Sequence, residues 1–130
     1  MDDCRVSPGI VFVGRYRIAA GSSGDWLAAN REMTEFVEES LPAVIAFDAY
    51  LSEDGTEATS IHVHRDADSF EQYLVAAASR IGHGAQVVQV LAIDLYGEPS
   101  AEVVQRLRGM GSWPVTVHSH VNGFGRSLER

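Results

Sequence analysis

The sequence contains no lysine: all ten of its basic residues are arginine, against 18 acidic residues. Without lysine, the protein cannot form a Schiff base with a substrate or use a P-loop lysine. The net charge of −8 leaves no basic footprint, which argues against a nucleic acid or an anionic membrane surface as a partner.

Cysteine and long apolar runs are also scarce. The single cysteine, Cys4, cannot form an internal disulfide. The first residues are acidic and lack the basic-then-apolar order of a secretory signal. No run reaches the roughly 18 apolar residues that suggest a membrane span. We therefore expect a cytoplasmic protein without a membrane segment.

The residues that are present suit a single globular domain. Of the 130 residues, 45% are apolar, which is enough to form a real core. No internal repeat, linker or low-complexity segment interrupts the chain. We predict one domain over residues 1–130, with a core at 10–97 and a C-terminal extension at 98–130.

Alternating β-branched and aromatic residues predict strands, and apolar residues three and four positions apart predict helices. Strands are expected at 10–19, 44–52, 58–65 and 87–96. Helices are expected at about 23–41 and 68–82, and Asp54-Gly55 predicts a hairpin between the second and third strands. A short helix from about residue 100 and a short strand at 114–120 follow in the extension.

The order βαββαβ is that of the ferredoxin-like fold, in the α+β class. Right-handed crossovers place both main helices on one face of an antiparallel sheet, with the first and third strands in its middle. The other face is then uncovered in a monomer. A two-fold homodimer that packs the two sheets face to face is the simplest way to cover it.

Alternation along each strand predicts which side chains face the helices. The apolar sets assigned to the helix side are Ile10, Phe12, Tyr16 and Ile18; Ile45, Phe47 and Leu51; Ile61 and Val63; and Leu91, Ile93 and Leu95. The opposite parity predicts a polar cluster on the uncovered face, formed by Arg15, Arg17, Asp48, His62, His64 and Asp94. His118 and His120 are further candidates for this cluster or for the dimer face.

The hairpin and helix EDGTEATSIHVHRDADSFEQYL, set in a βαββαβ chain, resemble the dimeric α/β-barrel superfamily. More narrowly, they are similar to antibiotic-biosynthesis-monooxygenase-like proteins, over residues 10–97. Members of that superfamily include cofactor-free oxygenases of aromatic polyketides, haem-degrading enzymes, isomerases and non-enzymatic stress proteins. The segment from YGEPSAEVV to VNGFGR resembles an extension of uncharacterised bacterial relatives. The resemblance thus implies a fold and a homodimer, and leaves several activities open.

A cofactor-free oxygenase needs a cavity between sheet and helices that binds an enolisable phenol. Tyr16, Trp26 and Tyr73 are the candidates to line such a cavity. The alternative is that all three are core aromatics without a role in binding.

Two H-x-H pairs, His62/His64 and His118/His120, have a spacing that lets both histidines of a strand reach one ion. Together they could complete a tetrahedral metal site if the last strand lay beside the third. The alternative for His62 and His64 is the polar cluster at the dimer face, which predicts a dimer sensitive to pH near the histidine pKa.

The resemblance also allows a test of haem degradation. Haem-degrading relatives carry an asparagine on the first strand and, at the second helix, a tryptophan and an axial histidine. This sequence has neither the asparagine nor the tryptophan, and only His83 could serve as an axial ligand. The pattern therefore disfavours haem.

The preferred hypothesis is a cofactor-independent, monooxygenase-like protein that binds a small aromatic or polyketide-type molecule, with an oxidoreductase activity left open. One alternative is a non-catalytic dimer that binds a small ligand or serves in stress. The second is a metal-dependent enzyme that uses the two histidine pairs.

Overall fold

The computed structural model of the chain describes residues 9–126, apart from the side chains of residues 79 and 81–85. It contains five strands and three helices in the order β1 (Ile10–Ile18), α1 (Ser23–Ser40), β2 (Val44–Leu51), β3 (Glu57–His64), α2 (Ala67–Ala85), β4 (Val88–Tyr96), α3 (Ala101–Arg108) and β5 (Val115–His118). None of these helices is long and apolar enough to cross a membrane. Cys4 lies outside the described residues.

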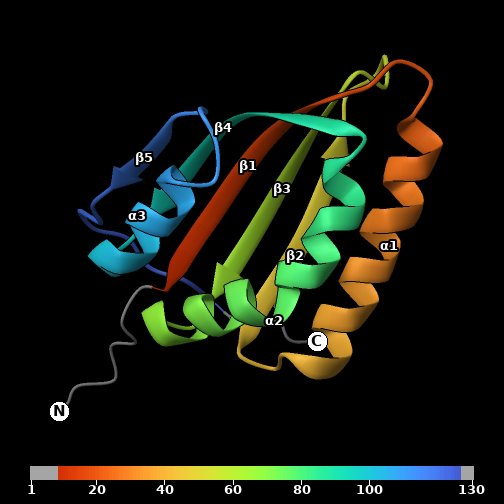
Figure 1. The fold of residues 1–130 in the computed structure, drawn as a ribbon. Coiled ribbons are helices and arrows are strands. Elements are labelled where there is room, and N and C mark those ends of the chain that lie inside the picture. Colours follow the sequence, from red (N-terminus) through yellow and green to blue (C-terminus); the bar gives the residue numbers. More distant parts are fainter. Residues whose placement is uncertain (1–8, 127–130) are drawn as a thin grey trace, which may run out of the picture.

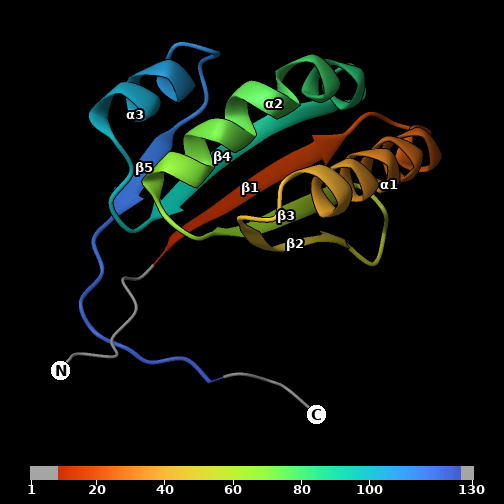
Figure 2. The ribbon, with the colours of Figure 1, turned by 90° about the horizontal axis from the view of Figure 1, so that it is seen from below.

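The strands form one sheet in the order β2-β3-β1-β4-β5. The first four strands pair antiparallel, and β5 joins the edge of β4 in parallel. Figure 1 and Figure 2 show the helices on one side of this sheet, with no described helix or strand on the other. The predicted ferredoxin-like α+β fold is confirmed, with β1 and β3 central and the extension adding α3 and β5.

The helices pack on the sheet because each has an apolar stripe at helical spacing. On α2 the stripe consists of Phe70, Tyr73 and Ala77, all buried. The third helix is held to α2 by Ser100, whose hydroxyl donates to a carboxylate oxygen of Glu71 at 3.0 Å. The same hydroxyl oxygen accepts from the Val103 amide and caps α3. The extension is therefore fastened to the core.

The prediction that His62 and His64 face away from the helices is wrong. In the β1–β3 ladder, Phe12 pairs with His62 and Ile10 pairs with His64, so both imidazoles share the helix face with those core residues. His62 is 4% exposed and His64 is completely buried. Both faces of β3 carry side chains that can be buried, and for this reason hydrophobicity alone did not reveal its orientation.

Two irregularities correct the predicted faces of neighbouring strands. The register of β1 with β4 shifts between Arg15 and Tyr16, so that Val88 and Val90 line the helix side although Leu91 was predicted there. The register of β2 with β3 shifts after Val44, and Ile45 is 64% exposed instead of facing the core. Bulges of this kind reverse the alternation that a sequence pattern assumes.

Gly14 makes room for Tyr16 on the helix face of β1. A β-carbon at Gly14 would lie 2.2 Å from the Tyr16 hydroxyl oxygen and 2.8 Å from the ring carbon that bears it. The Tyr16 side chain therefore lies back over Gly14, toward Ser60, which is paired with Gly14 across the β1–β3 ladder. A residue with any side chain at position 14 would displace this phenol.

We predict that Gly14→Ala lowers the free energy of unfolding by about 1–3 kcal/mol, because the methyl group overpacks the space under Tyr16. Urea unfolding measures the change. Gly24→Ala is the matched control, because nothing lies within 4 Å of its added methyl group and no loss is expected. In the Gly14→Ala background, Tyr16→Phe should recover part of the loss, and no recovery would contradict the packing argument.

The buried histidines predict a loss of stability in mild acid. Burial lowers the pKa of His62 to about 3 and of His64 to about 4, and for His62 the neighbouring His64 adds to the shift. The unfolded chain takes up these protons near pH 6.5, whereas the folded chain does not. The free energy of unfolding should therefore fall as the pH drops from about 7 to 5, at up to roughly 1.4 kcal/mol per pH unit for each histidine.

Urea unfolding at several pH values checks this expectation. His64→Leu should remove about half of the histidine-dependent slope between pH 6.5 and 5. His120→Gln is the control, because this histidine is exposed and its substitution should leave the slope unchanged. An identical slope in wild type and His64→Leu would refute the assignment.

Candidate functional site

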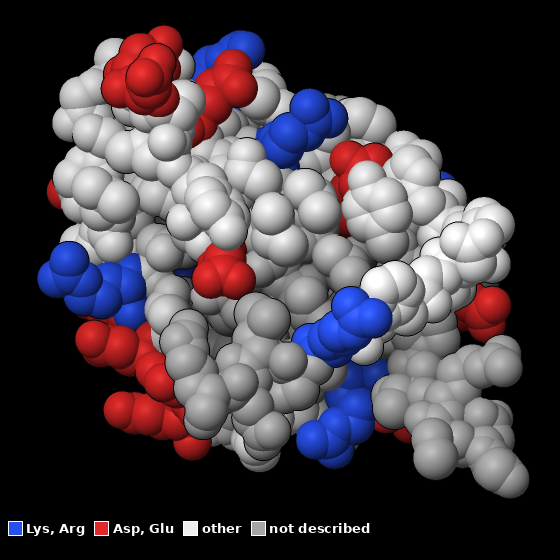
Figure 3. Space-filling view, turned by 180° about the vertical axis from the view of Figure 1, so that it is seen from behind, with Lys and Arg blue, Asp and Glu red and all other residues white. Residues whose placement is uncertain are grey.

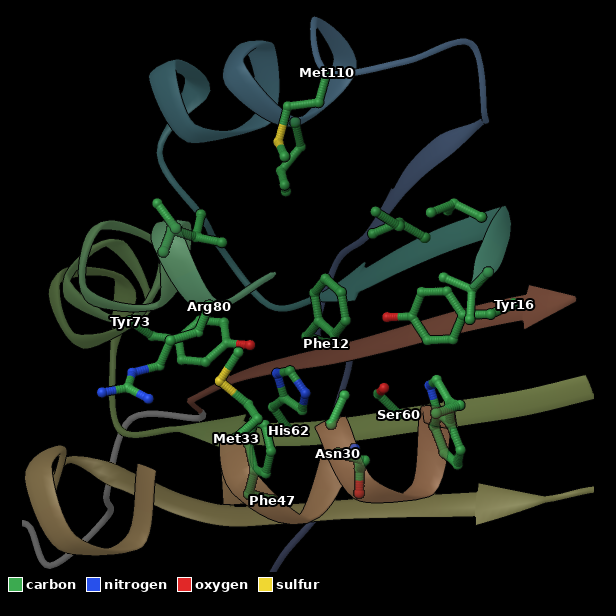
Figure 4. Close-up of a pocket in the computed structure, with 18 of the residues that line it drawn as sticks. Phe12, Tyr16, Asn30, Met33, Phe47, Ser60, His62, Tyr73, Arg80 and Met110 are labelled. Atoms are coloured by element: carbon green, nitrogen blue, oxygen red, sulfur yellow. The ribbon is translucent and has the colours of Figure 1, made fainter. Parts of the chain in front are cut away.

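A cavity of about 470 Å³ lies between the sheet and the helices. Its walls are mostly apolar and come from β1–β4, all three helices and the segment that follows α3 (Figure 4). A cavity of this size and polarity is typical of small-molecule sites. The expectation of a space between sheet and helices therefore agrees with the geometry.

A few polar side chains converge on this cavity. Tyr16 enters from β1, Ser60 and His62 from β3, and Tyr73 from α2. Figure 4 shows the hydroxyls of Tyr16 and Tyr73 pointing toward one another from opposite sides, with Phe12 and His62 between them. Their positions suit hydrogen bonds to the oxygens of one planar molecule.

These polar groups are uncharged at neutral pH. Burial raises the pKa of the Tyr16 phenol, and a hydrogen bond with Ser60 offsets part of that rise. Burial also raises the pKa of Tyr73, with a further contribution from Tyr16. The low pKa of His62 keeps its imidazole neutral. The site therefore offers two phenolic donors and a neutral imidazole in apolar surroundings.

The His62 ring is held by aromatic neighbours on both of its faces. Its centroid lies 4.7 Å from that of Phe12 and 4.1 Å from that of Phe47, with interplanar angles of 16° and 24°. The Tyr73 ring meets it nearly edge-on, at 5.1 Å and 69°. Stacking of this kind fixes the ring plane, so His62 presents a preorganised polar group.

Two buried nitrogens at the cavity wall lack a hydrogen-bond partner: Nδ1 of His62 and Nε1 of Trp113. Such atoms are costly to leave unsatisfied and are met elsewhere by water or ligand. Trp113 reaches the cavity because Gly111 has no side chain, and a β-carbon there would lie 2.1 Å from the indole. Two lining residues thus carry a buried polar atom whose hydrogen-bonding capacity is unmet within the described residues.

The three residues predicted to line a cavity, Tyr16, Trp26 and Tyr73, all do so. Their role in binding stays a prediction. Sequence reasoning missed His62, Ser60, Arg80 and Trp113 as lining residues. The HVH motif drew attention to His62, but only the register with Phe12 places it at this cavity.

The predicted polar cluster on the uncovered face forms only in part. Alternation in the observed registers leaves Arg15, Arg17, Asp48 and Asp94 on this face, without His62 and His64. Arg17 contacts Glu57 at 4.0 Å, and Asp94 Oδ1 lies 3.0 Å from His118 Nε2. The His118 ring also stacks on Tyr96, with a centroid distance of 4.4 Å.

The two histidine pairs, considered as an alternative metal site, do not come together. His118 lies on β5 at one edge of the sheet, and β1 and β4 separate it from His62 and His64 on β3. His120 follows β5 and is exposed. Among the described residues, no three His, Cys, Asp or Glu side chains come together to hold a metal. The side chain of His83, the candidate haem ligand, lies outside the described residues.

No protein-family model matches the chain, and neither does any curated protein sequence. Solved structures do match it. MupZ from Pseudomonas fluorescens aligns with a TM-score of 0.72 at 17% identity, covering 90% of this chain and 93% of MupZ. SnoaB, a cofactor-independent oxygenase from Streptomyces nogalater, aligns with a TM-score of 0.62 at 14% identity, covering 73% and 97% of the two chains.

A putative antibiotic biosynthesis monooxygenase from Bacteroides thetaiotaomicron aligns with a TM-score of 0.58 at 16% identity, covering 66% and 83% of the two chains. The match to MupZ includes part of the extension, because residues 10–97 amount to only about two-thirds of the sequence. Identities this low are informative about fold alone. The chain has the ferredoxin-like fold of antibiotic-biosynthesis-monooxygenase-like proteins, as its sequence pattern predicted.

Proposed function

We propose that the protein binds a small aromatic or polyketide-type molecule in the cavity and acts on it as a cofactor-independent, monooxygenase-like enzyme. The observation that carries this proposal is the cavity itself: apolar walls of suitable size around Tyr16, His62 and Tyr73. A structural neighbour that is a cofactor-independent oxygenase supports it.

The residues suit a substrate that supplies its own electrons. Tyr16 and Tyr73 donate hydrogen bonds to a phenol or enol oxygen and stabilise negative charge that develops there. The apolar walls hold the ring and keep water away from it. An electron-rich ring of this kind reduces dioxygen directly, one oxygen atom entering the ring as a carbonyl and the other leaving as water.

The active form, in this proposal, is a homodimer built through the uncovered sheet face. That face carries partly buried Val11, Val13, Ile61 and Val63, and Figure 3 shows many uncharged residues on this side of the molecule. The segment after β5 passes along the same side in Figure 2, with Val121 and Phe124 more than 80% exposed. Apolar surface of this extent favours a protein partner.

Anthrone, a planar molecule that enolises, tests the activity. The chain has two tryptophans, Trp26 and Trp113, and both line the cavity, so their fluorescence reports on its occupancy. We expect anthrone to quench this fluorescence, to consume oxygen and to yield anthraquinone and water. Tyr73→Phe should weaken binding by about 1 kcal/mol, the net worth of one hydrogen bond.

Val75→Ala is the control, since Val75 is 69% exposed on α2, away from the uncovered sheet face, and does not line the cavity. Quenching without oxygen uptake, by anthrone and by electron-richer dihydroxyanthrones, would favour the non-catalytic ligand-binding alternative. An absence of quenching by every planar phenol would refute the proposed function.

The dimer has a separate test. Ile61→Glu places a charge on the uncovered face at the position paired with Val13, and should convert the dimer to a monomer in sedimentation experiments. Val75 on α2 is 69% exposed and lies away from the uncovered sheet face, so Val75→Glu should leave the dimer intact. A wild-type protein that sediments as a monomer at micromolar concentration would contradict the dimer.

A further inference from the structure

Arg80 is the one charged side chain among the described residues that line the cavity. It continues the face of α2 that carries Tyr73 and Ala77, because positions 73, 77 and 80 recur at helical spacing. Its guanidinium carbon lies 4.0 Å from the ring centroid of Phe36 on α1. Figure 4 places it at the edge of the lining residues, beside Tyr73 and Met33.

No acidic side chain neutralises this arginine within the described residues. The ion pairs there join Arg17 to Glu57 and Asp94 to His118, and neither includes Arg80. Arg80 is exposed, and the cation–π contact with Phe36 leaves its N–H groups able to donate. The chain has a net charge of −8, so a positive group at this cavity contrasts with the protein's overall field.

The cavity has no group that readily removes a proton from a ligand. Its described lining residues include no carboxylate, and its two phenols are held neutral. Burial lowers the pKa of His62 to about 3, so its imidazole is a poor acceptor for the proton of a neutral phenol. A ligand that is already anionic needs no proton acceptor in the cavity, and is therefore favoured over one that must first lose a proton there.

We propose that the cavity selects aromatic or polyketide-type ligands that are already anionic at neutral pH, and that Arg80 at the cavity edge pairs with the ligand's oxyanion. The oxyanion is a carboxylate or the ionised enol of an acidic dicarbonyl, with the ring lying between the apolar walls. This inference rests on the proposed function, because it specifies the ligand of the same cavity. Arg80 is then a specificity-determining residue.

Two matched pairs of probes test this inference by quenching of tryptophan fluorescence. The first pair is 2-naphthoate and methyl 2-naphthoate; the second is 2-hydroxy-1,4-naphthoquinone, an acidic enol, and its methyl ether. In the wild type, the anion of at least one pair should bind about tenfold more tightly than its neutral partner, as expected for one charge-assisted contact. The pair that shows the preference identifies the type of oxyanion.

Arg80→Met should abolish this preference and leave the affinity for the neutral probe unchanged, which also shows that the variant is folded. Arg80→Lys should restore part of the preference, because it keeps the charge and loses the planar fork. Arg106→Met, an exposed position on α3 outside the cavity, is the control and should behave as the wild type.

The outcomes separate the two levels of the proposal. Equal binding of anion and neutral probe in both pairs, or a preference that survives Arg80→Met, overturns the role of Arg80 and leaves the cavity as a binding site. Neutral and anionic probes that all fail to quench refute the proposed function itself, and the inference with it.

Discussion

The stack of Phe12, His62 and Phe47 is the contact on which the site depends. It crosses three adjacent strands, β1, β3 and β2, and places a polar ring among apolar ones. Tyr73 closes the stack from α2 at 5.1 Å, which links the helix layer to the sheet. The same contact therefore orders the core and fixes the polar group at the floor of the cavity.

The two buried histidines reduce the stability of the fold, and the same burial keeps their imidazoles neutral. His64 is completely buried and neither of its ring nitrogens has a partner, while His62 leaves Nδ1 unpaired. Unpaired buried polar atoms reduce stability, and they also keep both imidazoles neutral. Together with the two raised tyrosine pKa values, this makes a site whose hydrogen-bonding groups are uncharged near neutral pH.

The same fold serves proteins of different function, so side chains must decide what this one does. The cofactor-independent oxygenase SnoaB shares its architecture at only 14% identity. In this chain the cavity has aromatic walls, several neutral polar groups and one arginine at its edge. These features support an aromatic oxyanion as the ligand. They are side-chain features, on which similarity of the backbone fold gives no information.

The sequence by itself determined the order of elements and the central position of β1 and β3, because helical and strand periodicities are local. It proposed Tyr16, Trp26 and Tyr73 as cavity residues and left open that they are core aromatics. Tertiary structure alone decided the face of His62, the bulge beside Leu91 and the packing of Trp113 over Gly111. Each of these depends on which residue of a distant strand or loop lies opposite. Where both faces of a strand can be buried, alternation does not tell which set of side chains faces the helices.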